Sequence, residues 1–432
     1  MHCLAILLLL LWYSYFIMTL SQELEARGFI YQTSTDSIAD ILDGGTRTVY
    51  LGIDPTASSI HVGNLVPYML LNRLATAGHK VILLLGGGTA LIGDPGGKSV
   101  ERPFVSAEIV AKQAEAMEAG IRRFVSPEVT FVNNHDWLSK LSMIEYLRDV
   151  GKHFTVNAMV KKDIVANRLT DDNSISYTEF SYSLLQAYDY HYLYKEHGCD
   201  LQIGGSDQWG NIIAGVDFIR RKEGAQVHAL TMPLVVDKAT GKKFGKSEGN
   251  AIWLNEEKTS PYEFYQFWLN TSDESVVDYL KLFTFMSLEE IKQLEQQWQA
   301  DPGARLAQKQ LAQAVTTFVH GESVAQSVAK VSKLLFGEGE LSDLDEAERE
   351  VLIANAPTHQ AVLGSDVVSV VVEAGLASSK REARTFVESG AVAINGVKTT
   401  DIEAVIDESM FSNSLALVKR GKNQFCVLQL AA

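Results

Sequence analysis

The sequence predicts an α/β protein in which a parallel sheet with crossover helices is followed by a helical domain and a small α+β module. Three patterns indicate this order. Strand-like and helix-like segments alternate from Gly28 onward, helix formers dominate Pro261–His320, and a hairpin signal lies near the C-terminus. Alternation of strand and helix is typical of a sheet built from βαβ units.

The first βαβ unit is the clearest local pattern. Val49–Asp54 is expected to be a buried strand, and Val81–Leu85 is a second, wholly apolar one. Between them the apolar side chains recur at helical spacing. Because proline is tolerated only in the first turn of a helix, Pro67 predicts that this helix begins near His61–Asn64. Leu201–Gly205, again followed by a helical pattern, predicts another unit.

Composition divides the rest of the chain. The strand patterns end near Asn250, so the α/β domain is expected to span 18–250 and a helical domain 251–336. Residues 337–358 are rich in acids, which favours a linker or an exposed helical connection. Residues 359–432 predict a small α+β module, in which Asn395-Gly396 marks a hairpin.

The first 17 residues are unusual, because Leu4–Leu20 carries no charge. The segment lacks the basic residues and the small-residue cleavage site of a signal peptide, and its length is at the lower limit of a membrane span. We expect residues 1–17 to be an extension outside the working protein, with a membrane anchor as the alternative. From Met18 a polar helix, Leu20–Gly28, is expected.

Charge and cysteine content restrict the class of protein. The formal net charge is −15, from 38 Lys and Arg against 53 Asp and Glu. A nucleic-acid partner would therefore need a local basic patch. Cys3, Cys199 and Cys426 are scattered, with no CxxC spacing. We expect no structural metal and a reducing, cytoplasmic location.

Three segments could bind phosphate. His61-Val-Gly-Asn64 lies where a strand leads into a helix, and helix amino ends attract phosphate. Gly241–Gly249 holds three glycines and three lysines, which could carry ammonium groups to a polyphosphate. Gly86–Arg102 is glycine-rich and ends in cations, but lacks the GxxxxGK[ST] arrangement of a P-loop NTPase. The alternatives are a turn histidine bonded to backbone and a solvated lysine-rich hairpin.

A further candidate is one face of a predicted helix. Tyr182, Gln186 and Asp189 are spaced i, i+4 and i+7. At about 100° per residue this spacing places all three within roughly 60° of one another, so one ligand could touch them all. The alternative is that they form the wet side of an amphipathic helix.

Taken together, these segments resemble the bacterial-type tyrosyl-tRNA synthetases, of the class I aminoacyl-tRNA synthetases. The resemblance runs from about Leu20 to the C-terminus. The segments that carry it are Tyr50-Leu-Gly-Ile-Asp-Pro-Thr-Ala57, His61-Val-Gly-Asn64, Leu91-Ile-Gly-Asp94-Pro, Tyr177-Thr-Glu-Phe-Ser-Tyr182 with Gln186-Ala-Tyr-Asp189, Leu201-Gln-Ile-Gly-Gly-Ser-Asp207-Gln-Trp-Gly-Asn211, and Lys243-Phe-Gly-Lys-Ser247. It implies a Rossmann-like catalytic domain, an anticodon-arm-binding helical domain and an S4-like RNA-binding module.

The resemblance also implies a reaction. Such an enzyme activates L-tyrosine with ATP to tyrosyl-adenylate and pyrophosphate, and then transfers tyrosine to the 3'-terminal ribose of tRNA(Tyr). Magnesium is expected to arrive with ATP rather than in a protein cage. A homodimer without a membrane partner is implied as well.

Site residues follow by similarity. The groups expected around the phosphates are Thr56, His61, Asn64, Lys98, Arg102, Lys243 and Lys246. Tyr50 and Asp189 are expected at the phenol hydroxyl of tyrosine. The groups expected at its ammonium group are Asp94, Tyr182 and Gln186. The nucleotide and ribose would be lined by Gly52, Asp54, Gly63, Gly205, Asp207 and Gln208, together with Lys246.

The chain departs from the family signatures at two places. Asn64 replaces the second histidine of the HxGH signature, and an Asn amide can still donate to ATP. Phe244-Gly245 and Ser247 form a variant of the KMSKS loop that keeps both lysines. In the C-terminal module, the cations expected to contact RNA are Lys380, Arg381, Arg384, Lys398 and Lys419. The alternative for these is ordinary surface charge.

Two other functions remain open. One is the sister tryptophanyl-tRNA synthetase, which the Tyr50/Asp189 pair and the appended RNA module disfavour. The other is an RNA-binding protein for splicing or regulation, built on a synthetase that has lost activity. Intact His61, Lys243 and Lys246 argue against that loss.

Overall fold

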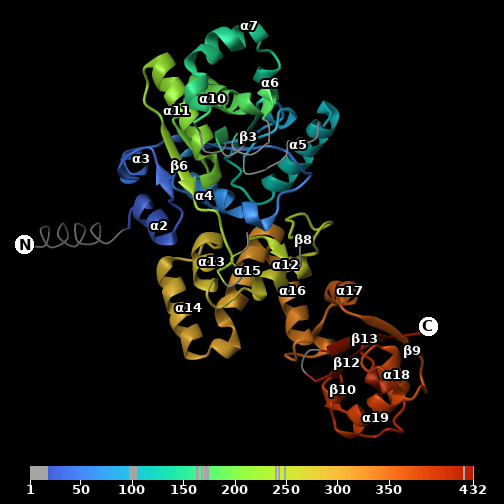
Figure 1. Ribbon diagram of the computed structural model, residues 1–432. Helices are drawn as coiled ribbons and strands as arrows, with labels where there is room; N and C mark the ends of the chain where they lie inside the picture. The colour runs from blue at the N-terminus through green and yellow to red at the C-terminus, as the bar shows by residue number, and fades with distance from the viewer. Residues whose placement is uncertain are drawn as a thin grey trace, which may run out of the picture. The chain divides into compact units, whose positions relative to one another are not determined.

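The computed structural model describes residues 18–96, 105–161, 165–166, 169, 175–238, 241, 244–247, 250–421 and 424–431 (Figure 1). The hydrophobic start at 1–17 and the predicted cations Lys98, Arg102 and Lys243 lie outside this range. Within it, no helix is both long and apolar enough to cross a membrane. The chain forms two compact units, one of residues up to Lys258 with Ser272–Ala307, the other of Thr259–Thr271 with Gln308 onward.

The first unit is built on a six-stranded sheet in the order β1-β6-β5-β2-β3-β4. The strands are β1 Gln32–Thr33, β2 Thr48–Ile53, β3 Lys80–Leu85, β4 Thr130–Asn133, β5 Leu201–Gly205 and β6 His228–Met232. Strand β1 pairs antiparallel with β6, and all other neighbours are parallel. The predicted parallel sheet and the three predicted strands, which are β2, β3 and β5, are confirmed.

The order of the strands creates a switch point. From β2 the chain adds β3 and then β4 on one side, whereas β5 and β6 continue on the other side of β2. Crossover connections that leave β2 and β5 in opposite directions open a crevice beyond the carboxyl ends of these strands. The sheet topology therefore predicts where a ligand binds.

Helices of the first unit surround this sheet. They are α2 Leu20–Arg27, α3 Ala39–Leu42, α4 Leu65–Thr76, α5 Ala107–Arg122, α6 His135–Leu138, α7 Met143–Glu145, α8 Val156–Met159, α10 Tyr177–His197, α11 Trp209–Glu223, α13 Val276–Phe283 and α14 Leu288–Ala300. A single 3₁₀ turn, Val62–Asn64, precedes α4. The start predicted from Pro67 is therefore confirmed. Gly28 closes α2 in the left-handed conformation, as the sequence predicted.

Helices α10 and α11 pack against each other and against the sheet. Their shared core includes Tyr50, Tyr190 and Ile219, all at most 1% exposed. The Tyr190 hydroxyl donates to the His228 carbonyl at 2.7 Å. A Cβ at Gly215 would lie 2.9 Å from Cδ1 of Tyr190, so glycine is needed where α11 passes this ring.

Within the first unit, two buried arginines attach α13 to α2 and α4. Arg27 donates to the carbonyls of Lys281 and Met286, and Arg73 donates to the carbonyl of Thr284. Both guanidinium groups pair with Glu23. Part of the segment expected in a separate helical domain thus packs against α2 and α4 of the first unit, because the two arginines bind carbonyls at the carboxyl end of α13. The domain boundaries at 250, 336 and 358 stay predictions.

The second unit begins with helices. They are α12 Pro261–Leu269, α15 Leu306–His320, α16 Glu322–Leu335 and α17 Glu346–Asn355. In the acidic segment, Leu341, Leu344 and Leu352 are buried, and Glu348 accepts from Lys330 at 2.7 Å. The expected helical connection is present as α17, but it packs on α16 and is less exposed than its acids suggested. Its role as a linker stays a prediction.

The C-terminal module has its own five-stranded sheet, in the order β11-β10-β12-β13-β9. Its strands and helices are β9 Thr358–Ala361, α18 Val367–Glu373, α19 Lys380–Glu388, β10 Val392–Ile394, β11 Val397–Lys398, β12 Leu415–Arg420 and β13 Gln424–Leu430. A separate hydrophobic core forms between these elements. Asn395 and Gly396 both have positive φ, 46° and 80°, which confirms the predicted hairpin turn.

Candidate active site

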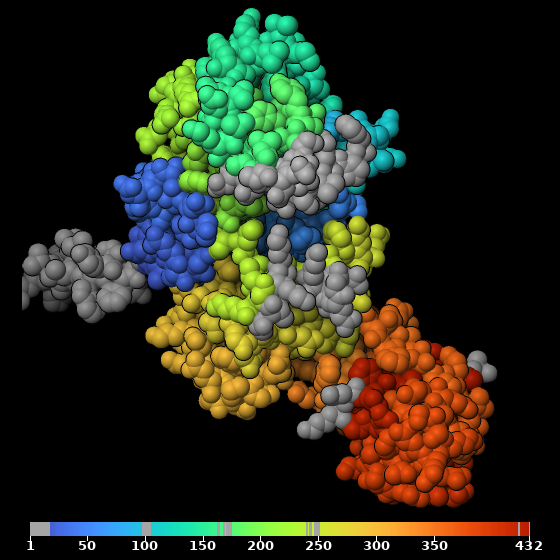
Figure 2. Space-filling view, viewed as in Figure 1, coloured from blue at the N-terminus to red at the C-terminus, as the bar shows by residue number. Residues whose placement is uncertain are grey.

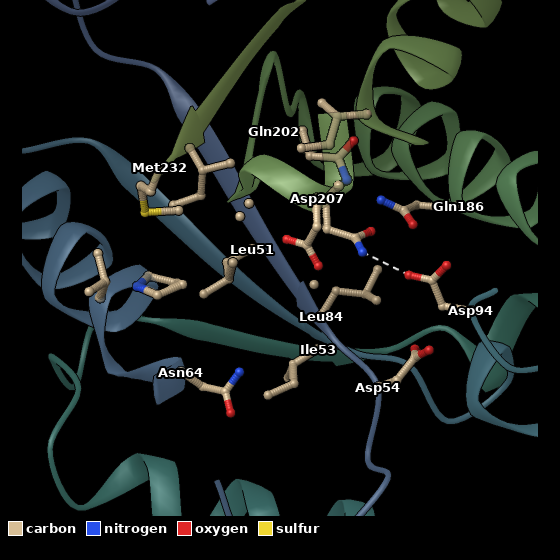
Figure 3. Close-up of a pocket in the computed structure, with 18 of the residues that line it drawn as sticks. Leu51, Ile53, Asp54, Asn64, Leu84, Asp94, Gln186, Gln202, Asp207 and Met232 are labelled. Carbon is tan, nitrogen blue, oxygen red and sulfur yellow. Dashed lines mark hydrogen bonds between the residues drawn. The ribbon is translucent and has the colours of Figure 1, made fainter. Parts of the chain in front are cut away.

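A cavity of about 310 Å³ lies in the first unit. Its lining includes the carboxyl-terminal residues of β2, β5 and β6, so it occupies the crevice at the topological switch point. Figure 3 shows Gln186, Asp94 and Asp207 gathered on one side of it. The cavity is therefore where the fold places a ligand.

Most of the predicted site residues line this cavity. All five residues expected to bind tyrosine do so: Tyr50, Asp94, Tyr182, Gln186 and Asp189. The residues expected at the nucleotide follow: Gly52, Asp54, Gly63, Gly205, Asp207 and Gln208. Thr56 and Asn64 are also in the lining. His61 stands next to it, as the N-cap of the 3₁₀ turn before α4.

The side chains of the four predicted cations are outside the part of the chain that the structure describes. Lys98, Arg102 and Lys243 fall outside the described residues, and Lys246 is described only in its backbone, in β7 Lys246–Ser247. This strand pairs with β8 Asn250–Ala251. The expected contacts of these four cations with phosphate stay predictions.

One face of α10 contributes three of the lining residues. Tyr182, Gln186 and Asp189 all line the cavity, as the resemblance to the synthetases implied. The alternative of a wet helix side is wrong, since Tyr182 is 6% exposed and Asp189 is 2% exposed. Neighbouring Leu184 and Ala187 are buried in a different cluster.

Asp189 is a buried carboxyl group held by two donors. Trp137 donates from Nε1 to Oδ1 at 2.7 Å, and Asn134 donates from Nδ2 to Oδ2 at 2.9 Å. Burial raises the pKa of Asp189 to about 7, although both hydrogen bonds act to lower it. Donation from a further hydroxyl would favour the ionised carboxylate.

Tyr50 supplies a hydroxyl beside this carboxyl group. Its ring is 1% exposed and packs edge-on against Tyr190, with ring centroids 5.2 Å apart. Burial, with the charge of Asp189 nearby, raises the pKa of Tyr50 well above its usual value. Its hydroxyl makes no hydrogen bond within the described residues. Because an unpaired buried hydroxyl is costly, this group is suited to a ligand that accepts from Tyr50.

A second network surrounds Asp54. Tyr182 donates to Oδ2 at 2.8 Å, and Thr89 donates to Oδ1 at 2.7 Å. The Asn134 side-chain amide donates to the Thr89 hydroxyl at 2.9 Å. The same amide also donates to the Asp189 carboxylate. Burial and the Asp54 charge raise the pKa of Tyr182 well above its usual value, which keeps its hydroxyl neutral. The carboxyl groups of Asp54 and Asp189 are therefore joined through Thr89 and Asn134.

Asp94 makes a similar link. Gln208 donates from Nε2 to its Oδ2 at 2.7 Å (Figure 3), and the Gly96 amide donates to Oδ1 at 2.9 Å. Asn211 in turn donates to the Gln208 side chain at 3.2 Å. Asp94, expected at an ammonium group, is thus oriented by Gln208, expected at the nucleotide.

Sequence reasoning missed three residues of these networks. Thr89, Asn134 and Trp137 had no predicted role, yet they fix the carboxylates of Asp54 and Asp189. Asn134 directly follows β4, whose carboxyl end lies at the same edge of the sheet as that of β3. The available signal was the polar pair Asn133-Asn134 at the end of β4.

Within the described residues, no group of acids, histidines and cysteines could hold a metal ion.

Comparison with known proteins identifies the family. Residues 43–337 match the family of class I tRNA synthetases (W and Y). The chain belongs to this family. Residues 348–428 match the tyrosine–tRNA ligase SYY-like C-terminal domain.

Relatives of this synthetase extend over nearly the whole chain. It is 44% identical over 421 residues to the tyrosine–tRNA ligase of Streptococcus mutans, covering 95% of this chain and 100% of that one. Identity with tyrosine–tRNA ligase 1 of Vibrio vulnificus is 46% over 418 residues, or 95% and 98% of the two chains. A truncated mitochondrial tyrosyl-tRNA synthetase of Aspergillus nidulans is 32% identical, with a TM-score of 0.67, over 73% of this chain and 94% of that one. The predicted family and class I fold are confirmed.

The raised pKa of Asp189 predicts a pH dependence of stability. Because the folded protein binds this proton more tightly than the unfolded chain, Asp189 stabilises the fold below its ordinary pKa of 3.8, and this contribution is lost as the pH rises through about 7. The urea midpoint of the wild type should therefore fall, relative to Asp189→Asn, between about pH 5 and about pH 8. Circular dichroism during urea unfolding measures both midpoints. A constant difference across this range would contradict the assignment.

Proposed function

We propose that this synthetase is a tyrosine–tRNA ligase, which activates L-tyrosine with ATP and transfers it to the 3'-terminal ribose of tRNA(Tyr). The observation that carries the proposal is a pair in the lining of the cavity, the Tyr50 hydroxyl without a hydrogen bond among the described residues and the buried Asp189 carboxyl group, whose charge acts on it. Relatives that are named tyrosine–tRNA ligases support it along nearly the whole chain.

Tyrosine satisfies this pair with a single group. Its phenol oxygen accepts from Tyr50 while its proton is donated to Asp189. Phenylalanine brings no hydroxyl, so both buried groups would remain without a ligand partner. Tryptophan lacks the hydroxyl as well. At the other end of the amino acid, Asp94, Tyr182 and Gln186 offer oxygen atoms to the ammonium group.

The first chemical step needs placement rather than a covalent enzyme intermediate. The tyrosine carboxylate attacks the α-phosphate of ATP, a carboxylate–phosphate bond forms, and pyrophosphate leaves. Catalysis therefore depends on in-line alignment and on donors that stabilise charge on the departing pyrophosphate. Thr56 lies in the loop after β2, and His61 and Asn64 lie at the turn before α4, where backbone N–H groups also point outward.

Loop cations complete the phosphate site in this proposal. Lys98, Arg102, Lys243 and Lys246 supply the ammonium and guanidinium groups, and ATP enters with Mg²⁺ as its counter-ion. Gly52, Gly63 and Gly205 permit close approach of backbone to the nucleotide.

The C-terminal module supplies the RNA surface. Lys380, Arg381 and Arg384 are exposed on α19, and Lys398 is exposed in the hairpin. Lys419 differs from these, because its Nζ is partly buried and donates to the Leu334 carbonyl at 3.3 Å. We assign the exposed four to tRNA phosphate contacts and Lys419 to fixing the carboxyl end of α16.

The functional proposal is tested by pyrophosphate exchange. Purified protein is assayed with ATP and labelled pyrophosphate in the presence of tyrosine, tryptophan or neither. We expect exchange that depends on tyrosine. Exchange with tryptophan alone would indicate the sister enzyme, and a folded protein without exchange would indicate a binding protein that has lost activity.

Matched variants tie this exchange to the cavity. Tyr50→Phe removes the unpaired hydroxyl and should lower the preference for tyrosine over phenylalanine by about 5- to 10-fold, the size of one neutral hydrogen bond. Tyr31→Phe is the control, because Tyr31 is 60% exposed. Equal preference ratios in both variants would remove Tyr50 from the tyrosine site.

Removal of the C-terminal module should separate the two half-reactions. The module has its own hydrophobic core, so deletion after about residue 358 leaves the cavity intact. We expect exchange within about 2-fold of the wild type and tRNA charging reduced by about 10-fold or more, since phosphate contacts dominate RNA affinity. Aminoacylation assays with tRNA(Tyr) measure the second effect. Equal charging by the truncated protein would show that the module is dispensable.

An exposed apolar surface supports the expected homodimer. Met143, Ile144, Leu147, Val156 and Tyr177 are between 49% and 76% exposed. The segments that carry them are α7, Tyr146–Val150, α8 and the start of α10, which are drawn turquoise to green at one end of the first unit in Figure 2. Such a patch is typical of a protein interface. Sedimentation should show a dimer that Ile144→Glu dissociates, whereas Ile109→Glu on α5 does not. A monomeric wild type would contradict the proposal.

A further inference from the structure

A short extended segment joins two predicted phosphate-binding regions. Residues 252–254 follow the β7–β8 hairpin and run antiparallel to the turn that contains His61. The Val62 amide donates to the Ile252 carbonyl at 2.9 Å, and the Leu254 amide donates to the Ile60 carbonyl at 3.0 Å. The Ile252 amide donates to the Gly245 carbonyl at 3.1 Å. These bonds hold the hairpin and the His61 turn in one register.

Trp253 lies at the centre of this pairing. Side chains alternate along an extended segment, so Ile252 and Leu254 point into the protein, at 8% and 6% exposed, and Trp253 points the other way. Its ring meets the imidazole of His61 with centroids 6.0 Å apart and planes inclined by 78°. Lys258 lies over the indole, with Nζ 4.5 Å from the ring centroid. The indole is therefore fixed between an imidazole and an ammonium group.

The other side of His61 is also fixed. Its Nδ1 accepts from the Gly63 amide at 3.1 Å, so the neutral imidazole carries its proton on Nε2 and offers a donor there. A Cβ at Gly63 would lie 2.8 Å from Cε1 of His61 and 2.8 Å from the Phe244 carbonyl oxygen. The His61 imidazole, Gly63 and the backbone at Phe244, just before β7, are thus in close contact.

We propose that Trp253 is a positioning residue for adenylate formation, acting by fixing the His61 ring against the turn before α4. This inference rests on the proposed function, because it takes His61 as a donor to the pyrophosphate side of ATP. Trp253 is not among the residues that line the cavity, so we expect its loss to leave tyrosine binding unchanged. Its loss affects the step in which charge develops on the phosphates.

The test is the effect of Trp253→Leu on kcat and KM in pyrophosphate exchange, with tyrosine affinity measured by calorimetry. The variant keeps the backbone pairing and removes the ring. We expect kcat to fall by about 3- to 10-fold, the size of one edge-to-face aromatic contact, with the Kd for tyrosine unchanged. Trp253→Phe keeps an aromatic edge and should retain most of the rate. Trp298→Leu on α14 is the control for loss of a half-buried indole, with wild-type values expected.

A double variant distinguishes action through His61 from a separate role. In a His61→Ala background, Trp253→Leu should change kcat by less than about 2-fold, because its partner is already absent. A full further loss in that background, an unchanged kcat in Trp253→Leu, or a parallel loss of tyrosine binding would each overturn the proposal. Absence of tyrosine-dependent exchange in the wild type would instead refute the proposed function.

Discussion

The site depends on one constraint, the burial of the Asp189 carboxyl group at 2% exposure. Moving a carboxylate out of water is costly unless donors replace the lost hydration. Trp137 and Asn134 supply two donors, and the pKa nevertheless remains near 7. The remaining cost is removed when the carboxyl group is protonated or when a ligand donates to it. In the proposed function, preference for a hydroxyl-bearing side chain follows from this incomplete solvation by the protein.

Other parts of the first unit serve to hold this arrangement. Asn134 accepts from the Gly88 amide at 2.7 Å while donating to Asp189 and Thr89, so one amide fixes the loop after β3, the Asp54 network and the buried carboxyl group. Trp137 is in turn stacked on Tyr192, with centroids 4.2 Å apart. Displacement of Asn134 would therefore disturb the carboxyl groups of both Asp54 and Asp189, because the two networks share members.

Local patterns were enough to predict much of this. The strand at β2 and the start of α4 are encoded by an apolar run and one proline, and these elements carry Tyr50 and Asn64. The inward face of α10 with Asp189 followed from the resemblance, because its spacing alone favoured a solvent-exposed face. Contacts between distant segments were not visible. Asn134 is 55 residues from Asp189, and Arg73 reaches Thr284 across 211 residues. Composition also pointed to solvent exposure of the acidic segment and did not reveal that Leu341, Leu344 and Leu352 are buried there.

The most direct test of the account is a crystal structure of the protein with L-tyrosine bound. We predict that the phenol oxygen lies within about 2.6–3.2 Å of both the Tyr50 hydroxyl and an Asp189 carboxylate oxygen. We also predict that the ammonium group lies beside Asp94. A tyrosine bound in the reverse orientation, or with its hydroxyl in contact with neither residue, would contradict the central claim.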